Sequence, residues 1–241
     1  MRKWICTLLF FSLPLFYASF LYGGESIYNL VVSELPDYKS YIFEIRTSAG
    51  TRYIPPSWSR GVEIWSDFQA GMSDQISMKI STGYNLSSGH SGFGVGGGFR
   101  ILKSDSYEVS LALELLRETE GVFTFHTGFL ATYRIGLFEF SLNNYLDKSF
   151  SKFRDPFDWH LTLAFSGRKK FLIYGFEYLG EDLEDLWERE EAEGGANNFV
   201  GLIVGIDLGN YGIAVTPGYS LGPRKNYRGA FLFLGKIWFT I

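Results

Sequence analysis

Residues 73–84 read SDQISMKISTGY, and apolar and polar side chains alternate along this stretch. One set is Ile76, Met78, Ile80, Thr82 and Tyr84, and the other is Gln75, Ser77, Lys79, Ser81 and Gly83. A period of two residues is typical of a β-strand whose two faces meet different surroundings. A soluble sheet would bury the apolar face, whereas a membrane barrel would turn it outward to lipid, and alternation alone leaves both readings open.

The same alternation recurs along the chain and predicts about twelve strands. They are expected at 41–48, 61–71, 75–84, 92–102, 107–116, 122–134, 137–146, 157–166, 170–179, 198–208, 211–220 and 229–241. On this assignment the apolar faces carry no charged residue, and the opposite faces carry all the strand charges. Strands of about ten residues are long enough to cross a bilayer when tilted.

The connections between these strands alternate in length. Tight turns are expected at 72–74, 103–106, 135–136, 167–169 and 209–210, and all but one of the intervening connections are longer. Outer-membrane barrels have short periplasmic turns and longer outside loops. The sequence therefore predicts an all-β fold, a transmembrane antiparallel up-and-down β-barrel over residues 39–241.

The first 24 residues resemble a secretory signal peptide that is cleaved. Arg2 and Lys3 precede an apolar run, and the small residues Gly23 and Gly24 follow it. A first membrane helix is the alternative, but the apolar run is short and Pro14 interrupts it. Residues 25–38 are then expected to form an N-terminal segment that is periplasmic or inserted into the lumen.

The net charge and the cysteine content exclude some kinds of partner and cross-link. The formal charge of −4 becomes −6 without residues 1–24, because that segment holds two bases and no acid. A negative chain is not expected to bind nucleic acid. The only cysteine, Cys6, lies in the expected signal peptide, so the mature chain would have no disulfide.

The polar faces of the strands are expected to line the lumen. The predicted lumen-lining residues are Glu44, Arg46, Glu63, Asp67, Lys79, Arg100, Glu108, Glu114, His126, Arg134, Glu139, Asn143, Tyr145, Asp158, His160, Glu177, Asp207 and Lys236. A second wall, smooth and apolar, is expected from Ile173, Gly175, Gly201, Ile203, Gly205, Gly212, Ala214 and Gly218. Either an amphipathic solute slides along that wall or residues 25–37 pack on it.

Other motifs favour structural over catalytic roles. Gly92, Gly94 and Gly97 match a dinucleotide-binding spacing, but no helix is expected after them, so no cofactor is predicted. Residues 181–193 hold eight acids and one arginine, which suits a solvated loop or one that bridges divalent cations.

The three histidines do not match a known catalytic pattern. Outer-membrane phospholipases and some lipid A deacylases place a serine two residues after the catalytic histidine. Here Gly92, Gly128 and Thr162 occupy those positions after His90, His126 and His160. No histidine pair has metal-ligand spacing, so we expect neither catalytic nor metal-binding residues.

The C-terminal GKIWFTI resembles the assembly signal of Gram-negative outer-membrane barrels, although Ile241 stands where an aromatic residue is usual. FQAGMSDQISMKISTGY and GFGVGGGFRIL resemble the transporter-type (MetA-like) barrels of phenol-degradation pathways. These resemblances imply an outer-membrane location and, as partners, outer-membrane lipid, lipopolysaccharide and the barrel assembly machinery.

The sequence as a whole favours a narrow passive channel for small solutes, amphipathic ones among them. Two alternatives stay open: an outer-membrane enzyme that modifies lipid, and a structural or surface-binding barrel with a blocked lumen.

Overall fold

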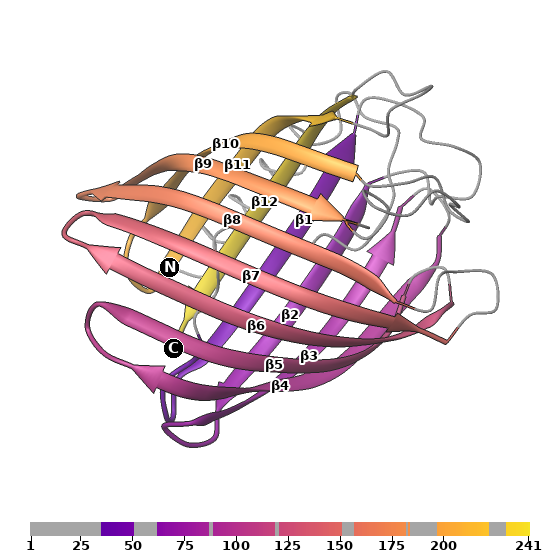
Figure 1. Cartoon of the computed structure of the whole chain (residues 1–241), viewed down its shortest axis with the longest axis horizontal. Coiled ribbons are helices and arrows are strands. Elements are labelled where there is room, and N and C mark those ends of the chain that lie inside the picture. The colour runs from indigo at the N-terminus through magenta and orange to yellow at the C-terminus, as the bar shows by residue number, and fades with distance from the viewer. Residues whose placement is uncertain are drawn as a thin grey trace, which may run out of the picture.

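Twelve antiparallel β-strands form one closed barrel (Figure 1). The computed structural model describes residues 35–50, 62–86, 89–118, 121–150, 157–181, 183, 197–221 and 230–241. The strands are β1 (Tyr41–Gly50), β2 (Glu63–Gly71), β3 (Ile76–Asn85), β4 (Ser91–Lys103), β5 (Tyr107–Arg117), β6 (Phe123–Ile135), β7 (Phe138–Ser149), β8 (Asp158–Lys169), β9 (Leu172–Glu181), β10 (Asn197–Asp207), β11 (Tyr211–Leu221) and β12 (Ala230–Thr240). The predicted fold class, a twelve-stranded all-β barrel, is confirmed.

Each strand pairs with its neighbours in sequence, and β1 pairs with β12 to close the sheet. Tyr41 and Ile241 exchange two backbone hydrogen bonds of 2.9 Å at this seam. Closure removes the unpaired edges that an open sheet would present. This matters most in lipid, where each unsatisfied backbone group costs several kcal/mol.

The outward face of the barrel is apolar and the inward face is buried. Met78 and Ile80 are 51% and 44% exposed, while their inward-facing neighbours Ser77 and Ser81 are 4% and 1% exposed. A single closed sheet with its apolar face outside excludes the alternative of a soluble sandwich, in which that face would be covered. Soluble monomers rarely expose apolar patches of this extent.

The strand boundaries lie within three residues of those predicted, but several strands are longer than expected. Their extra length corrects the prediction of an uncharged outward face, because Arg117, Lys148 and Lys169 lie at outward positions near strand ends. Charges near the rims of a membrane barrel cost much less than charges at its middle.

The expected smooth wall of glycines is not bare. The ring of Phe199 lies against Gly201 and Gly218, and the indole of Trp238 lies against Gly212, so a Cβ at any of the three would collide with an aromatic ring. Phe199 is 2% exposed and packs with Leu179 and Leu234. The glycines therefore accommodate large neighbouring side chains, which the sequence analysis did not foresee.

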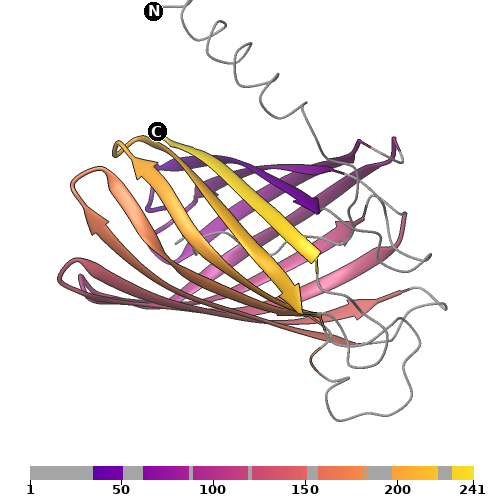
Figure 2. The same ribbon diagram turned by 90° about the horizontal axis from the view of Figure 1, so that it is seen from above.

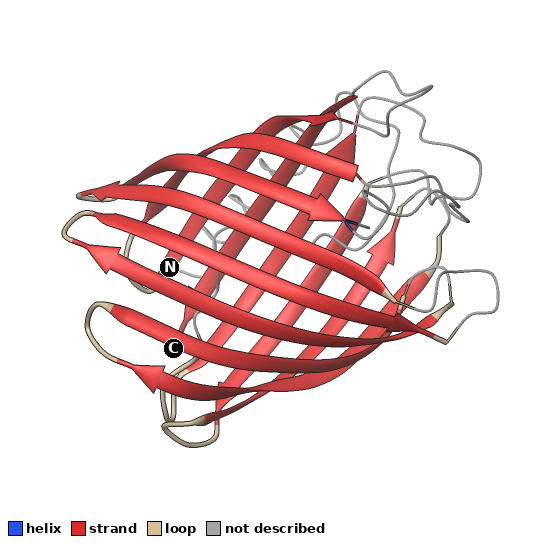
Figure 3. Cartoon of the chain, in the orientation of Figure 1, coloured by secondary structure: helices blue, strands red, loops and turns tan. Residues whose placement is uncertain are grey.

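The two ends of the barrel differ. The turn end carries the short connections 72–75, 104–106, 136–137, 170–171 and 208–210, and the opposite, loop end carries the longer ones (Figures 2 and 3). Within the described ranges, no helix has the length and apolar character of a membrane span.

Ile80 offers a test of which face meets the membrane. It is 44% exposed at an outward position of β3. Arg at the lipid-facing midplane of a barrel destabilises it by roughly 2–4 kcal/mol. Ile80→Arg should lower the free energy of unfolding from lipid vesicles by that amount, whereas Ile80→Leu should leave it unchanged. Urea unfolding followed by gel mobility measures both, and equal stability of the two variants would contradict this assignment of faces.

Candidate functional site

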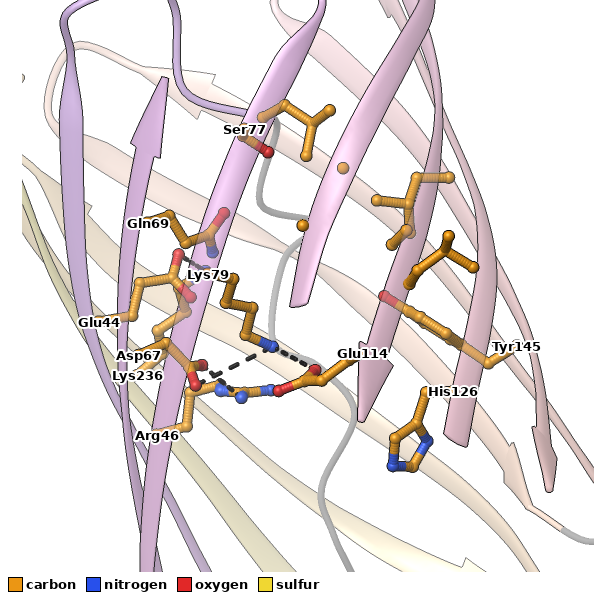
Figure 4. Close-up of a pocket in the computed structure, with 16 residues that line it drawn as sticks. Glu44, Arg46, Asp67, Gln69, Ser77, Lys79, Glu114, His126, Tyr145 and Lys236 are labelled. Carbon is orange, nitrogen blue, oxygen red and sulfur yellow. Dashed lines mark hydrogen bonds and ion pairs between the residues drawn. The ribbon is translucent and has the colours of Figure 1, made fainter. Parts of the chain in front are cut away.

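A network of ion pairs crosses the inner face of the barrel at mid-height (Figure 4). This ion-pair belt consists of Glu44, Arg46, Asp67, Lys79, Glu114 and Lys236. Lys79 Nζ lies 2.8 Å from Glu114 Oε2 and 3.9 Å from Asp67 Oδ1, and Arg46 also pairs with Asp67. On the other side of β1, Lys236 Nζ lies 2.7 Å from Glu44 Oε1.

Glycine on β4 allows the belt to pass between non-neighbouring strands. Glu114 stands on β5, yet it accepts a 2.6 Å hydrogen bond from Ser81 Oγ on β3. A Cβ at Gly94, on the strand between them, would lie 2.6 Å from Glu114 Oε1. The space that the sequence analysis assigned to lumenal glycines is therefore occupied by an acidic side chain.

The belt carries three acids and three bases, so its formal charges cancel. Glu44, Asp67 and Lys236 are almost fully buried. Charges held in such surroundings need their partners, because removing one member of a buried pair costs several kcal/mol. The belt thus restricts the lumen by side chains that hold one another in place.

The turn end is also balanced in charge. Arg134 Nε lies 3.0 Å from Glu139 Oε2, and Arg168 Nη1 lies 2.5 Å from Asp207 Oδ2. On β4 and β5, Arg100 Nε lies 3.3 Å from Glu108 Oε1.

Asp37, which precedes β1, joins the cations of the turn end. It bonds Lys103, and its Oδ1 lies 3.1 Å from Arg100 Nη2. The hydrogen bond from Lys103, together with the charges of both bases, holds the pKa of Asp37 below its ordinary value, although partial burial opposes this. A carboxyl with a lowered pKa stabilises the folded state above about pH 4 and loses that contribution as the pH falls toward the lowered value.

Two predicted histidines share one carboxylate near the loop end. His126 Nδ1 lies 2.6 Å from Asp147 Oδ1, and His160 Nε2 lies 3.0 Å from Asp147 Oδ2. Asp147 is not among the predicted lumen residues, because the seventh strand is expected to end at 146, which places 147 in a loop. The two-residue alternation of Asn143 and Tyr145 continues to Asp147, and this pattern could have placed Asp147 on the inward face.

The remaining predicted residues lie on the same inward faces. Asn143 and Glu177 are each 1% exposed, and the ring of Tyr145 lies against Gly128. Glu63 and Asp158 begin β2 and β8 at the loop end. The loop half of the inner face thus holds the acids Glu63, Asp147, Asp158 and Glu177, while its inward-facing histidines are His126 and His160.

Among the described residues, the inner face lines a cavity at the belt and another at the turn end. One of about 60 Å³ lies at the belt and also contacts His126 and Tyr145. The other, of about 720 Å³, lies at the turn end between Lys103, Arg134 and Trp238. Leu35, Glu44 and Lys236 line both cavities and therefore stand between them.

Most of the charged side chains of the described inner face form ion pairs with one another. No cluster of three or more His, Cys, Asp and Glu side chains in it is placed to hold a metal ion. His126 and His160 direct one ring nitrogen each at Asp147, and both are buried on the inward face, away from the outward surface where lipid would lie.

Some sequence predictions lie outside the described residues. They concern the signal segment 1–24, the part of the N-terminal segment before Leu35, and nearly all of the acidic stretch 181–193. They remain predictions.

Comparison with known proteins relates the chain to porins through its fold. No family model matches the sequence, and no curated protein is similar to it. The KdgM porin superposes with a TM-score of 0.59 at 7% sequence identity over 82% of this chain and 98% of that one. The NanC porin gives a TM-score of 0.58 at 8% identity over 82% and 98%. At such low identity these likenesses establish the barrel fold.

The belt predicts a measurable coupling between Lys79 and Glu114. Lys79→Met should lower the free energy of unfolding by about 3 kcal/mol, because it leaves the partly buried Glu114 without its cation, while Asp67 keeps Arg46. The effect should shrink by about 0.5–3 kcal/mol in a Glu114→Gln background, as expected for contacting residues. Lys148→Met, which removes an exposed rim lysine, is the matched control. Additive effects of the two belt substitutions in urea unfolding would contradict the pairing.

Proposed function

We propose that this protein is an outer-membrane channel for small solutes. The observation that carries the proposal is a closed barrel whose outward face is apolar and whose inward face holds most of the strand charges. An apolar exterior suits lipid, and a charged interior suits water and polar solutes. The shared fold of the KdgM and NanC porins supports the same role.

The orientation follows from the connections. In outer-membrane barrels the short turns face the periplasm and the longer loops face outward. The turn end, with its 720 Å³ cavity, would then open to the periplasm. The loop end, with Asp147 and Asp158, would face the outside.

The inner face suits small amphipathic solutes. Strands β1–β7 supply most of its charges, whereas β8–β12 supply two apolar clusters, one around Phe199 and the other around Ile173 and Ile203. A solute with a polar and an apolar side would match both walls. The resemblance to the MetA-like barrels of phenol-degradation pathways points to small apolar compounds, which the apolar wall would accommodate.

The charge balance disfavours large anionic solutes. The KdgM porin, which is similar in fold, is also known in complex with disordered oligogalacturonate. In the present chain the loop half of the inner face carries Glu63, Asp147, Asp158 and Glu177, so its field favours cations. We therefore propose a narrow pore with a mild preference for cations.

The blocked barrel is the competing reading, because the ion-pair belt leaves a cavity of only about 60 Å³. The lipid-modifying enzyme has less support. His126 and His160 point inward and bond Asp147. Mass spectrometry of lipid A and phospholipids from cells that express the wild type or His126→Ala distinguishes it, and we expect identical lipids.

Ion selectivity tests the channel proposal. Purified full-length protein in planar bilayers should give small single-channel currents, and its zero-current potential in a KCl gradient should indicate a cation preference. Asp158→Asn should shift this potential toward zero, because it removes an acid from the loop half, whereas Asp158→Glu, which keeps the charge, should not.

Two results would count against the proposal. Anion selectivity of the wild type would contradict the assignment of inner-face charges. A complete absence of current at any protein concentration would favour the blocked, structural barrel.

A further inference from the structure

Leu35, a described residue outside the strands, lies inside the barrel. Leu35 precedes β1 by six positions, yet it is only 9% exposed and lines both cavities. Its backbone is held on both sides: its N–H donates to Glu108 Oε1 at 3.2 Å, and its carbonyl accepts from Arg100 Nη2 at 2.6 Å. Two buried, oppositely charged side chains thus bind the two polar groups of one residue.

The side chain of Leu35 packs against Gly98 on β4. A Cβ at Gly98 would lie 2.7 Å from Leu35 Cδ1, and the next atom it would meet is Ser77 Oγ at 3.0 Å. The missing Cβ therefore leaves room for a side chain that comes from another part of the molecule. The three atoms nearest to a Cβ at Gly98 are all side-chain atoms. The absence of a side chain at Gly98 therefore makes room for Leu35 and is not required by the packing of the sheet backbone.

The residues after Leu35 are tied to the rim of the barrel. Asp37 pairs with Arg100 and Lys103. Lys39 N–H donates to the carbonyl of Gly71 at 3.1 Å, and Gly71 N–H donates to the carbonyl of Ser40 at 3.0 Å. The chain thus turns at the rim and runs back into the barrel as far as Leu35.

We propose that residues 35–37 form a latch, which closes the passage between the two cavities and must leave Gly98 for solute to pass. The proposal rests on the channel function proposed above and adds the part that controls it. Leu35 stands between the cavities together with Glu44 and Lys236, and those two side chains are fixed to each other at 2.7 Å. Leu35 is the member of this partition that belongs to no strand.

The contacts of Leu35 are suited to release, while Asp37 keeps the latch tied to the rim. Arg100 and Glu108 are 3.3 Å apart and stay paired when Leu35 leaves, and Arg100 Nη1 keeps its 2.7 Å bond to the carbonyl of Asp74. When Leu35 leaves, no buried charge therefore loses its partner. Such a loss would be strongly destabilising. The peptide groups of Leu35 regain water in exchange.

A reversible disulfide tests the latch in the intact barrel. In a Cys6→Ser background, Leu35→Cys and Gly98→Cys are combined, because the Leu35 side chain reaches the position of a Gly98 Cβ. The double variant should form a disulfide, seen as a thiol-free protein, and should lose its KCl current when oxidised. Reduction in the same bilayer should restore the current, while both single-cysteine variants should conduct equally before and after reduction.

Other results of this experiment would contradict either the latch or the channel function. A disulfide that forms without changing the current overturns the latch and leaves the channel standing. Failure of the disulfide to form in folded protein overturns the placement of Leu35 against Gly98, and with it the latch. If the wild type and every variant carry no current, the channel function itself fails.

Discussion

The pairing of β1 with β12 is the interaction on which the remainder of the structure depends. A sheet left open between these strands would expose the backbone groups of two edges, a cost that no arrangement of side chains offsets in lipid. Once the sheet closes, every strand has one face outside and one inside. The two-residue alternation of the sequence then becomes a separation between an apolar exterior and a polar interior.

Closure also determines how the interior is stabilised. The charged side chains on the inward face lie opposite one another across a narrow lumen, and most of them form ion pairs. The belt and the turn end are balanced, whereas the loop half keeps an excess of acids among the residues described. Glycines on β4, β10 and β11 give this interior its depth, because side chains such as Glu114, Leu35 and Trp238 occupy the space they leave. The lumen is thus shaped by a few contacts between distant segments.

The fold could be predicted from the sequence because alternation and turn spacing are local signals. Twelve strands and the faces of residues such as Ile80 and Lys79 follow from them. The contacts of the interior could not be predicted, since they depend on which residues meet across the barrel. Asp147 was missed because strand ends carry a weak signal, and an error of three residues at the end of β7 moved it into a loop. The place of Phe199 over two glycines depends on register between strands, and that of Leu35 over Gly98 depends on how a segment outside the strands enters the barrel; no single segment encodes either contact.

A cross-link at the seam tests the closed barrel most directly. In a Cys6→Ser background, Ile45→Cys and Ile237→Cys place cysteines on paired residues of β1 and β12. This is a hydrogen-bonded pair, because it lies four positions along the ladder from Tyr41 and Ile241, and the Cα atoms of such pairs are about 5.5 Å apart, within the range of a disulfide. Ile45→Cys with Ile213→Cys is the control, because Ile213 pairs with Ile237 on the far side of β12, about 10 Å from β1. The account predicts an efficient disulfide for the first pair and none for the second in folded full-length protein. Equal cross-linking of both pairs, or none at the seam, would contradict it.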